Sequence, residues 1–153
     1  MFKPGDPIDI LMADDDPDDR LMAGKALQEA HLKNGLYFVE DGEELMDFLR
    51  HKGKYCAVES YPLPGLILLD LNMPKKDGRE ALAEIKADPA LHRIPVVILT
   101  TSSAEEDICR TYDLGANSYI TKPVSFQGLA DAVKVLNSYW FQLVKLPTSP
   151  TAK

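Results

Sequence analysis

The stretch LMADDDPDD, from Leu11 to Asp19, places five aspartates directly after a short apolar run. Neighbouring like charges repel one another, so selection for stability alone would spread these carboxylates out or pair each with a basic residue. The apolar run is typical of a buried strand, and Asp16 followed by Pro17 is typical of a helix start. The stretch therefore predicts a strand, a carboxylate-rich turn and a helix, in that order.

Beyond this stretch, short β-rich runs alternate with amphipathic segments, which is typical of repeated β-α units and a parallel sheet. The runs LILL and VVIL, residues 66–69 and 96–99, contain no polar position and indicate a sheet buried on both faces. We therefore expect an α/β fold, a doubly wound sheet of five parallel strands with five flanking helices. The expected strands are residues 8–13, 36–40, 65–70, 95–100 and 118–121, and the expected helices are residues 17–31, 43–52, 78–88, 104–114 and 125–144.

Composition limits the classes of protein to consider. The chain has 153 residues, 45% of them hydrophobic, which suits one globular domain. A formal net charge of −7 argues against nucleic acid as a partner, because its binding normally needs a basic surface. No run has the length of a signal peptide core or a membrane span, so we expect a cytoplasmic protein without a membrane partner. Cys56 and Cys109 form no CxxC motif, and we expect both to be partly buried free thiols.

Polar residues stand where four of the expected strands end. The first strand runs into Asp14 and Asp15 and the third into Asp70, while Thr100 ends the fourth and Lys122 follows the fifth. In an open parallel sheet these ends form the ligand-binding edge. Three carboxylates about 5 Å apart repel by roughly 3 kcal/mol per pair at an effective dielectric constant of about 20. A hard divalent cation would relieve that repulsion, and carboxylate oxygens suit Mg²⁺ better than a transition metal.

Four segments each contain the end of one of these strands and the residues that follow it: LMADDDPDD, LILLDLNMPKKDG, VVILTTS and SYITKPV. Together they resemble the signature segments of receiver domains of two-component response regulators, and the resemblance spans residues 8 to about 138. It implies a flavodoxin-like sheet with the strand order 2-1-3-4-5. It also implies a signalling protein rather than an enzyme. Such a protein accepts a phosphoryl group from a partner histidine kinase, catalyses only its own phosphorylation and dephosphorylation, and signals through protein contacts.

The resemblance assigns roles at the acidic end of the sheet. Asp70 would be the phosphoacceptor and, with Asp15 and the backbone carbonyl of Asn72, a direct ligand of Mg²⁺. Asp14 would bind the same ion through water. Phosphoryl transfer needs little beyond positioning and neutralisation of the phosphoryl oxygens, which a metal and a lysine can supply.

The resemblance also implies a conformational switch. Lys122 and Thr100 would contact the phosphoryl group, and Tyr119 would be the aromatic residue that moves inward when the threonine is pulled toward the phosphate. One modification would then bias a two-state element. The family further implies a cis bond between Lys122 and Pro123, which would direct the ammonium at the site.

The remaining acidic residues of the opening stretch have a simpler interpretation. Asp16, Asp18 and Asp19 lie at the expected helix start, where carboxylates accept hydrogen bonds from free amides and favour the positive helix end. We expect all three to serve the helix rather than a ligand. Ser103 followed by Glu106 is typical of a capping box and predicts the start of the fourth helix.

Two other families bind metal or phosphate with clustered aspartates. A calcium-binding EF-hand loop that starts at Asp14 would have Asp19 where glycine is needed and Lys25 where glutamate is needed, so it is excluded. A haloacid-dehalogenase-like Mg²⁺-dependent phosphatase also uses an aspartyl phosphate. It needs a second aspartate two residues after the nucleophile as general acid, whereas Asn72 holds that position here. This phosphatase remains the alternative function.

The end of the chain suggests how a signal leaves the protein. We assign residues 1–144 to the receiver domain and residues 145–153 to a tail. The last expected helix is extended, and the stretch SYWFQLVKLP, residues 138–147, would leave an apolar patch exposed unless another chain covers it. This end resembles that of single-domain regulators that partner phytochrome-type histidine kinases, so a bacteriophytochrome is a candidate kinase. We expect a homodimer built on the apolar residues of this stretch, which are Trp140, Phe141, Leu143, Val144 and Leu146.

Overall fold

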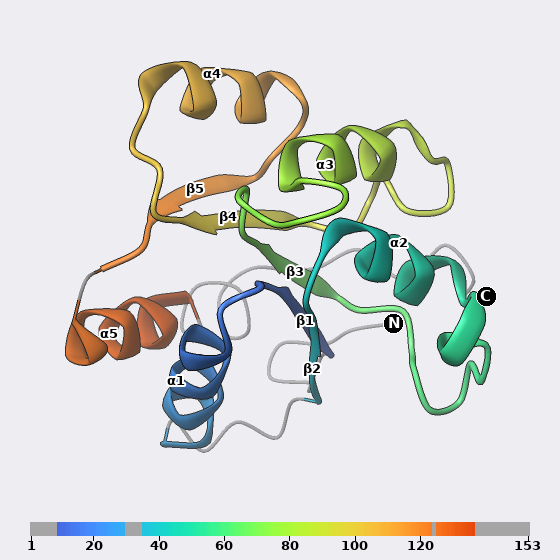
Figure 1. Ribbon diagram of the computed structural model, residues 1–153, viewed down its shortest axis with the longest axis horizontal. Coiled ribbons are helices and arrows are strands. Elements are labelled where there is room, and N and C mark those ends of the chain that lie inside the picture. The colour runs from blue at the N-terminus through green and yellow to red at the C-terminus, as the bar shows by residue number, and fades with distance from the viewer. Residues whose placement is uncertain (1–8, 30–34, 124, 137–153) are drawn as a thin grey trace.

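The computed structural model describes residues 9–29, 35–123 and 125–136, which form a five-stranded parallel sheet covered by helices on both faces (Figure 1). The strand order is β2-β1-β3-β4-β5, so the expected doubly wound fold and its order are confirmed. The strands are β1 (Ile10–Ala13), β2 (Leu36–Val39), β3 (Leu66–Leu69), β4 (Val96–Thr100) and β5 (Ser118–Thr121). The helices are α1 (Pro17–Glu29), α2 (Gly42–Arg50), α3 (Gly78–Ala87), α4 (Glu105–Asp113) and α5 (Phe126–Leu136), with a short 3₁₀ helix η1 (Gly53–Tyr55) after α2.

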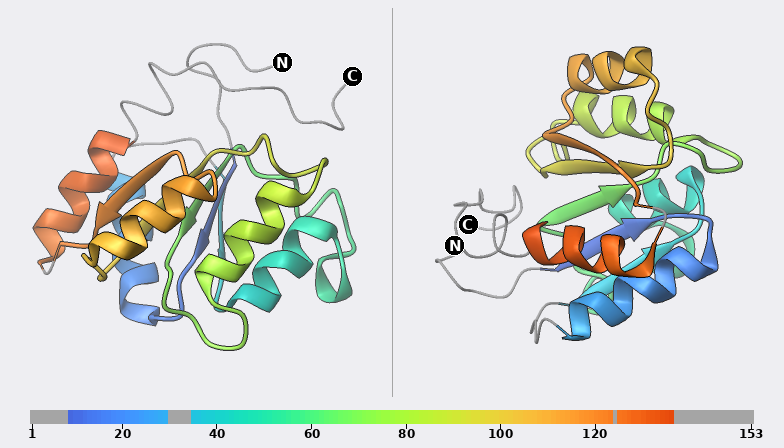
Figure 2. Two further views of the ribbon diagram at one scale, coloured as in Figure 1. Left: turned by 90° about the horizontal axis from the view of Figure 1, so that it is seen from above. Right: turned by 90° about the vertical axis from the view of Figure 1, so that its left-hand side faces the viewer.

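Two hydrophobic cores lie on the two faces of the sheet because successive strand residues point to opposite sides. On β1, Leu11 and Ala13 pack with α2 and α3, whereas Ile10 and Met12 pack with α1 and α5. Figures 1 and 2 show α1 and α5 side by side on one face, with α2, α3 and α4 on the other. Every residue of β1, β3 and β4 is buried, as the unbroken apolar runs predict.

Pairing of the strands aligns their carboxyl ends at one edge of the sheet. Ala13 of β1 pairs with Leu69 of β3, so the residues that follow them, Asp14 and Asp70, emerge side by side. The amide of Asp70 donates to the carbonyl of Ala13 at 3.0 Å, which extends the ladder to that point. The expected acidic edge is therefore a direct consequence of register.

The helix starts agree with the sequence in one case and differ in another. Asp16 precedes α1 and its carboxylate accepts a hydrogen bond from the amide of Asp18 at 2.9 Å, as expected of a capping residue. The expected capping box of the fourth helix is wrong. Residue Ala104 occupies the cap position of α4 without a side-chain hydrogen bond, and α4 begins at Glu105. Ser102 takes over part of the task, since its Oγ accepts from the Ala104 amide at 3.4 Å.

Other expectations are corrected or fall outside the described residues. Cys56, at the end of η1, and Cys109, in α4, are exposed free thiols and not partly buried as expected. Helix α5 is described as far as Leu136, so the expected extension to residue 144 and the tail residues from Trp140 to Leu146 lie outside the described part.

Candidate functional site

Three carboxylates meet at the carboxyl ends of β1 and β3. Each of Asp14, Asp15 and Asp70 offers one oxygen, and these oxygens all lie within 4.8 Å of one another. Asp14 and Asp70 are buried, whereas Asp15 is exposed and faces solvent at the rim of the site. The structure thus brings together the three acids that the sequence places at strand ends.

The ammonium of Lys122 lies at the centre of an acidic cluster. It contacts Oδ2 of Asp14 at 2.5 Å, Oδ2 of Asp19 at 2.7 Å and Oδ2 of Asp70 at 3.3 Å. Its side chain is only 6% exposed, so these contacts are shielded from water. An ammonium has three N–H donors, and each of them has a carboxylate here.

Burial and charge act against each other in this cluster. Burial raises the pKa of Asp14 to about 6, although hydrogen bonds from Lys122 and from the amide of Asp16 lower it. Burial also opposes the charge on Lys122, but its hydrogen bonds to Asp14 and Asp19 outweigh that effect and raise the pKa of Lys122 above its usual value. The lysine is therefore charged, and its one ammonium contacts three carboxyl groups.

This donor set fits a hard divalent cation. It offers carboxylate oxygens from Asp14, Asp15 and Asp70, with neither sulfur nor imidazole among the clustered groups. A single ammonium leaves these acids with excess negative charge, which a divalent ion would balance. The backbone of Asn72 also reaches the site, because its amide donates to Oδ1 of Asp70 at 3.2 Å.

The carboxylate of Asp70 is held by donors on both oxygens. Its Oδ1 accepts from the hydroxyl of Thr100 at 2.8 Å and from the amide of Asn72, while its Oδ2 faces Lys122. Thr100 is fully buried at the end of β4, where strand pairing fixes its position. Tyr119 does not reach the acids. Its hydroxyl donates to the carbonyl of Ser102 at 2.9 Å, two residues beyond Thr100.

The expected cis bond before Pro123 is wrong, since the described residues contain no cis peptide. Lys122 reaches the acids without it because its own amide donates to the carbonyl of Thr100 at 2.6 Å. This hydrogen bond continues the pairing of β4 and β5 and fixes the backbone of Lys122 before the chain reaches Pro123.

The chain matches the family of the response regulator receiver domain over residues 10–134. That range includes all five described strands and every carboxylate of the cluster. The chain belongs to the response regulator receiver domain family. The family match leaves the phosphatase alternative without support.

Relatives of similar length support the assignment of this receiver domain. Response regulator Rcp1 from Synechocystis sp. is 44% identical over 140 residues, which cover 92% of this chain and 93% of that protein. A crystal structure of the Mn²⁺-bound form of Rcp1 aligns with a TM-score of 0.85 over 93% of this chain and all of that one. The phosphorylated cyanobacterial phytochrome response regulator RcpA is 43% identical and aligns with a TM-score of 0.88 over 94% of this chain and all of that one.

The position of Asp19 adds to the sequence interpretation of the receiver domain. Asp19 lies in the first turn of α1, as the sequence predicts, but its carboxylate accepts from the ammonium of Lys122. The sequence contains part of this information, because α1 begins directly after β1 and its first turn therefore lies over the same edge of the sheet. What the sequence lacked was the direction of the Lys122 side chain, which depends on long-range packing of β5 and α1.

A second polar group that the sequence analysis missed ties the β4–α4 loop to α3. Arg79, in the first turn of α3, donates from Nε and an Nη to the two carboxylate oxygens of Asp107 in α4, both at 2.8 Å. Ser102 also donates to Asp107, at 2.7 Å. The loop that follows Thr100 is therefore anchored at Ser102 by Asp107 and by Tyr119.

Within the described residues no helix is both long and apolar enough to cross a membrane.

We expect Arg79→Ala to lower the free energy of unfolding by about 1 kcal/mol near neutral pH, because a partly buried bidentate ion pair is lost. The hydrogen bond from Arg79 holds the pKa of Asp107 at about 2, below its ordinary 3.8. The pair therefore stabilises the fold fully above the ordinary pKa, and this contribution disappears as pH falls through about 2. Urea unfolding across that range measures the difference between variant and wild type.

The matched control for this prediction is Arg93→Ala, which removes an exposed arginine in the loop before β4. Its free energy of unfolding should stay close to that of the wild type at every pH. A deficit in Arg79→Ala that does not shrink in acid would contradict the proposed role of the ion pair.

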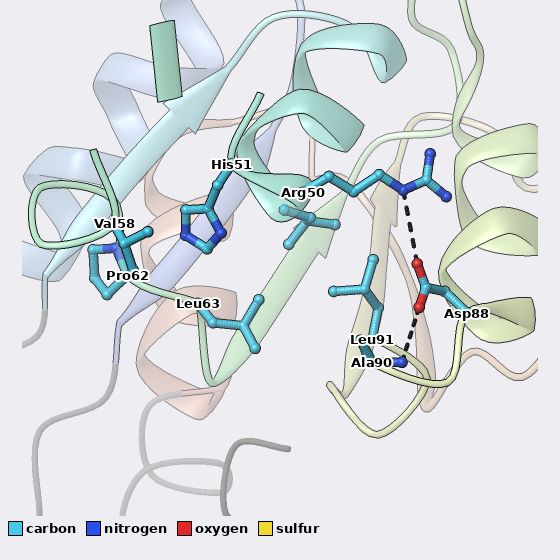
Figure 3. Close-up of a pocket in the computed structure, with 9 residues that line it drawn as sticks. Arg50, His51, Val58, Pro62, Leu63, Asp88, Ala90 and Leu91 are labelled. Atoms are coloured by element: carbon cyan, nitrogen blue, oxygen red, sulfur yellow. Dashed lines mark hydrogen bonds and ion pairs between the residues drawn. The ribbon is translucent and has the colours of Figure 1, made fainter. Parts of the chain in front are cut away.

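A pocket of about 600 Å³ is lined by the end of α2 and by the segments that precede β3 and β4, so it lies at the amino-terminal edge of the sheet (Figure 3). Its wall is largely apolar, and its charged groups are engaged with each other: Arg50 lies 3.7 Å from Asp88, which also accepts from the amide of Ala90. The ring of His51 bonds to the carbonyl of Tyr61 at 2.9 Å. None of the residues that line the pocket belongs to the acidic cluster, so the pocket is separate from it. Its lining consists of Leu49, Arg50, His51, Val58, Pro62, Leu63, Asp88, Ala90 and Leu91.

Proposed function

We propose that this receiver domain accepts a phosphoryl group on Asp70 from a partner histidine kinase, with Mg²⁺ as the cation. The observation that carries the proposal is the position of the Asp70 carboxylate, which lies beside the carboxylates of Asp14 and Asp15 and 3.3 Å from the ammonium of Lys122. Family membership supplies the reaction, and the geometry supports the choice of residue.

In the proposed reaction one oxygen of the Asp70 carboxylate attacks the phosphorus of a phosphohistidine. The new O–P bond forms as the P–N bond breaks, and the electron pair of that bond stays on the imidazole nitrogen. Lys122, the hydroxyl of Thr100 and the amide of Asn72 are donors that can bind the phosphoryl oxygens, whose charge dominates such transfers. When bound, Mg²⁺ neutralises those oxygens further.

The proposed holders of the cation are Asp15 and Asp70 directly, Asp14 through water, and the backbone carbonyl of Asn72. Their oxygens support this role because the three carboxylates already lie within reach of one ion. A Mn²⁺-bound structure of the relative Rcp1 supports a divalent ion in general, and Mg²⁺ is our specific assignment.

The signal would leave through Thr100 and Tyr119. Thr100 donates to Asp70, so a phosphoryl group on that carboxylate changes what the hydroxyl contacts. Tyr119 holds the carbonyl of Ser102 in the adjoining loop. A shift of Thr100 is therefore transmitted to the loop, to Tyr119 and to the outer surface of α4 and β5, where partners can detect it.

Incubation with acetyl phosphate and Mg²⁺ tests this function. We expect the intact protein to gain the mass of one phosphoryl group per chain, in a form that mild base removes, as is usual for an acyl phosphate. Excess chelator should prevent the gain, because the acidic cluster then keeps its excess negative charge. Mass spectrometry of the intact chain measures both results, and failure of the Mg²⁺-loaded protein to gain phosphate would contradict the proposal.

For the kinase we propose a phytochrome-type histidine kinase, with both proteins in the cytoplasm. Support comes from RcpA, a phytochrome response regulator, and from the bacteriophytochrome response regulator RtBRR, which is 36% identical over 95% of this chain and 86% of that one, with a TM-score of 0.73. Transfer from a purified bacteriophytochrome, compared with an unrelated histidine kinase, tests the pairing. Equal rates from the two kinases would contradict it.

We also propose that the protein is a homodimer through residues 138–147, whose apolar side chains include Trp140 and Phe141. A chain that ends at residue 137 should then have half the mass in solution of the full-length protein, as measured by light scattering or sedimentation. Equal masses would exclude this segment from the interface.

A further inference from the structure

Asp19 differs from the other two carboxylates that contact Lys122. Asp14 and Asp70 belong to the group of oxygens that could hold a cation, whereas Asp19 does not. It comes from the first turns of α1, and its side chain is 18% exposed. The only contact of its carboxylate among the described residues is the ammonium of Lys122 at 2.7 Å.

The distances from the Lys122 ammonium to the three carboxylates show which of them it lies closest to. It lies closer to Asp14 and Asp19, at 2.5 and 2.7 Å, than to Asp70, at 3.3 Å. A cation would share the charge of Asp14 and weaken its attraction for the lysine, but it would leave Asp19 unaffected, since Asp19 is outside the cation group. Asp19 is therefore the partner that keeps its hold on Lys122 when the site is loaded.

We propose that Asp19 is a positioning residue that restrains the Lys122 ammonium on the α1 side of Asp70 and so shortens the lifetime of the phosphorylated state. The inference rests on the proposed phosphorylation of Asp70. A phosphoryl group on Asp70 needs the same ammonium as a counter-charge, so Asp19 and the phosphoryl oxygens compete for one donor. Without Asp19 the ammonium is free to move to the phosphate and hold it.

The start of α1 provides the rigid support that such a restraint needs. The guanidinium of Arg20 donates to the backbone carbonyl of Asp14 at 2.7 Å and contacts Glu40. The carboxylate of Asp14 also accepts from the amide of Asp16 at 2.9 Å. Asp19 is thus attached to a helix whose first turn is bonded to the end of β1, while Lys122 is the longer and more flexible partner.

The neighbouring Asp18 offers a matched control. It lies in the same turn and carries the same charge, but it is exposed and makes no contact with Lys122. Asp18→Asn and Asp19→Asn therefore each remove one negative charge, at adjacent positions in the first turn of α1. A difference between them reports the contact with Lys122 rather than the net charge of the helix start.

The kinetic test follows loss of phosphate after the phosphodonor is removed, in full-length protein with Mg²⁺. We expect Asp19→Asn to lose phosphate several-fold more slowly than the wild type, Asp18→Asn to match the wild type, and Asp19→Glu to restore most of the wild-type rate. In a Lys122→Gln background the Asp19→Asn change should have no effect, because the residue acts through the lysine. An unchanged or shorter lifetime in Asp19→Asn, or a persistent effect without Lys122, would overturn the inference.

A second measurement needs no phosphate and separates this inference from the proposed function. In ¹⁵N-lysine-labelled protein without phosphodonor, the Nζ resonance of Lys122 should move in Asp19→Asn and stay in place in Asp18→Asn. If it does not move in Asp19→Asn, the restraint is absent and the inference fails. If it moves but the wild type never takes up phosphate, the contact stands and the proposed function fails, together with the lifetime effect built on it.

Discussion

The Asp70→Asn variant is expected to take up no phosphate from acetyl phosphate, a complete loss compared with one group per chain in the wild type. An amide nitrogen is a poor nucleophile, and the remaining amide oxygen carries no formal charge with which to attack phosphorus. The variant keeps the size of the side chain and an acceptor for the hydroxyl of Thr100. Intact-protein mass spectrometry in the presence of Mg²⁺ measures the loss.

Asp16→Asn is the matched control for this variant. Asp16 stands two residues from Asp14 in the same acidic stretch but is exposed and caps α1, a task that asparagine performs equally well. It should accept phosphate like the wild type. A full mass gain in Asp70→Asn, or a loss in Asp16→Asn, would show that the acceptor is another residue.

The Gly78→Ala variant is expected to lose about 3 kcal/mol of unfolding free energy, because the added methyl group has no room. A Cβ at Gly78 would meet the backbone carbonyl oxygen of Asp70 and lie 2.7 Å from the Cα of Leu71. Both obstacles are backbone atoms, so no side-chain rotation relieves them. Since the displaced backbone belongs to Asp70, uptake of phosphate should fall as well. Chemical denaturation and mass spectrometry measure the two effects.

Gly24→Ala provides the comparison on α1. Its Cβ would meet only Cζ of Phe38, at an ordinary 3.8 Å, inside a helix where alanine is preferred. The change should leave stability unchanged or raise it by up to about 1 kcal/mol. Equal losses in Gly24→Ala and Gly78→Ala would mean that the close approach of α3 to Asp70 is not what limits residue 78.

The fold was predictable because each level of the sequence agrees with the others. Unbroken apolar runs such as residues 66–69 specify buried parallel strands, and helical segments of suitable length separate them. Strand order came from the family resemblance rather than from these patterns. Helix limits were less accurate, as the start of α4 shows, because Ser102 and Asp107 bond to each other and leave the expected capping residue Ser103 without that role.

The site was predictable as far as strand ends determine it. Asp14 and Asp70 emerge together because their strands are neighbours in register, and Thr100 is fixed in the same way. The contact of Asp19 with Lys122 was not predictable, because it depends on the direction of a long lysine side chain that follows β5. Arg79 and Asp107 are 28 residues apart, and nothing in their local sequence marks them as partners. Roles at strand ends follow from topology, whereas contacts between long side chains need coordinates.

The pocket beyond Leu49 and the acidic cluster occupy opposite rims of the sheet. This separation makes the amino-terminal rim a place for engineering. Insertions, purification tags or fluorescent labels in the loop around Val58, which is exposed, would be remote from the carboxylates of the acidic cluster. A sensor built on this scaffold could therefore carry its reporter on one rim while its chemistry proceeds undisturbed on the other.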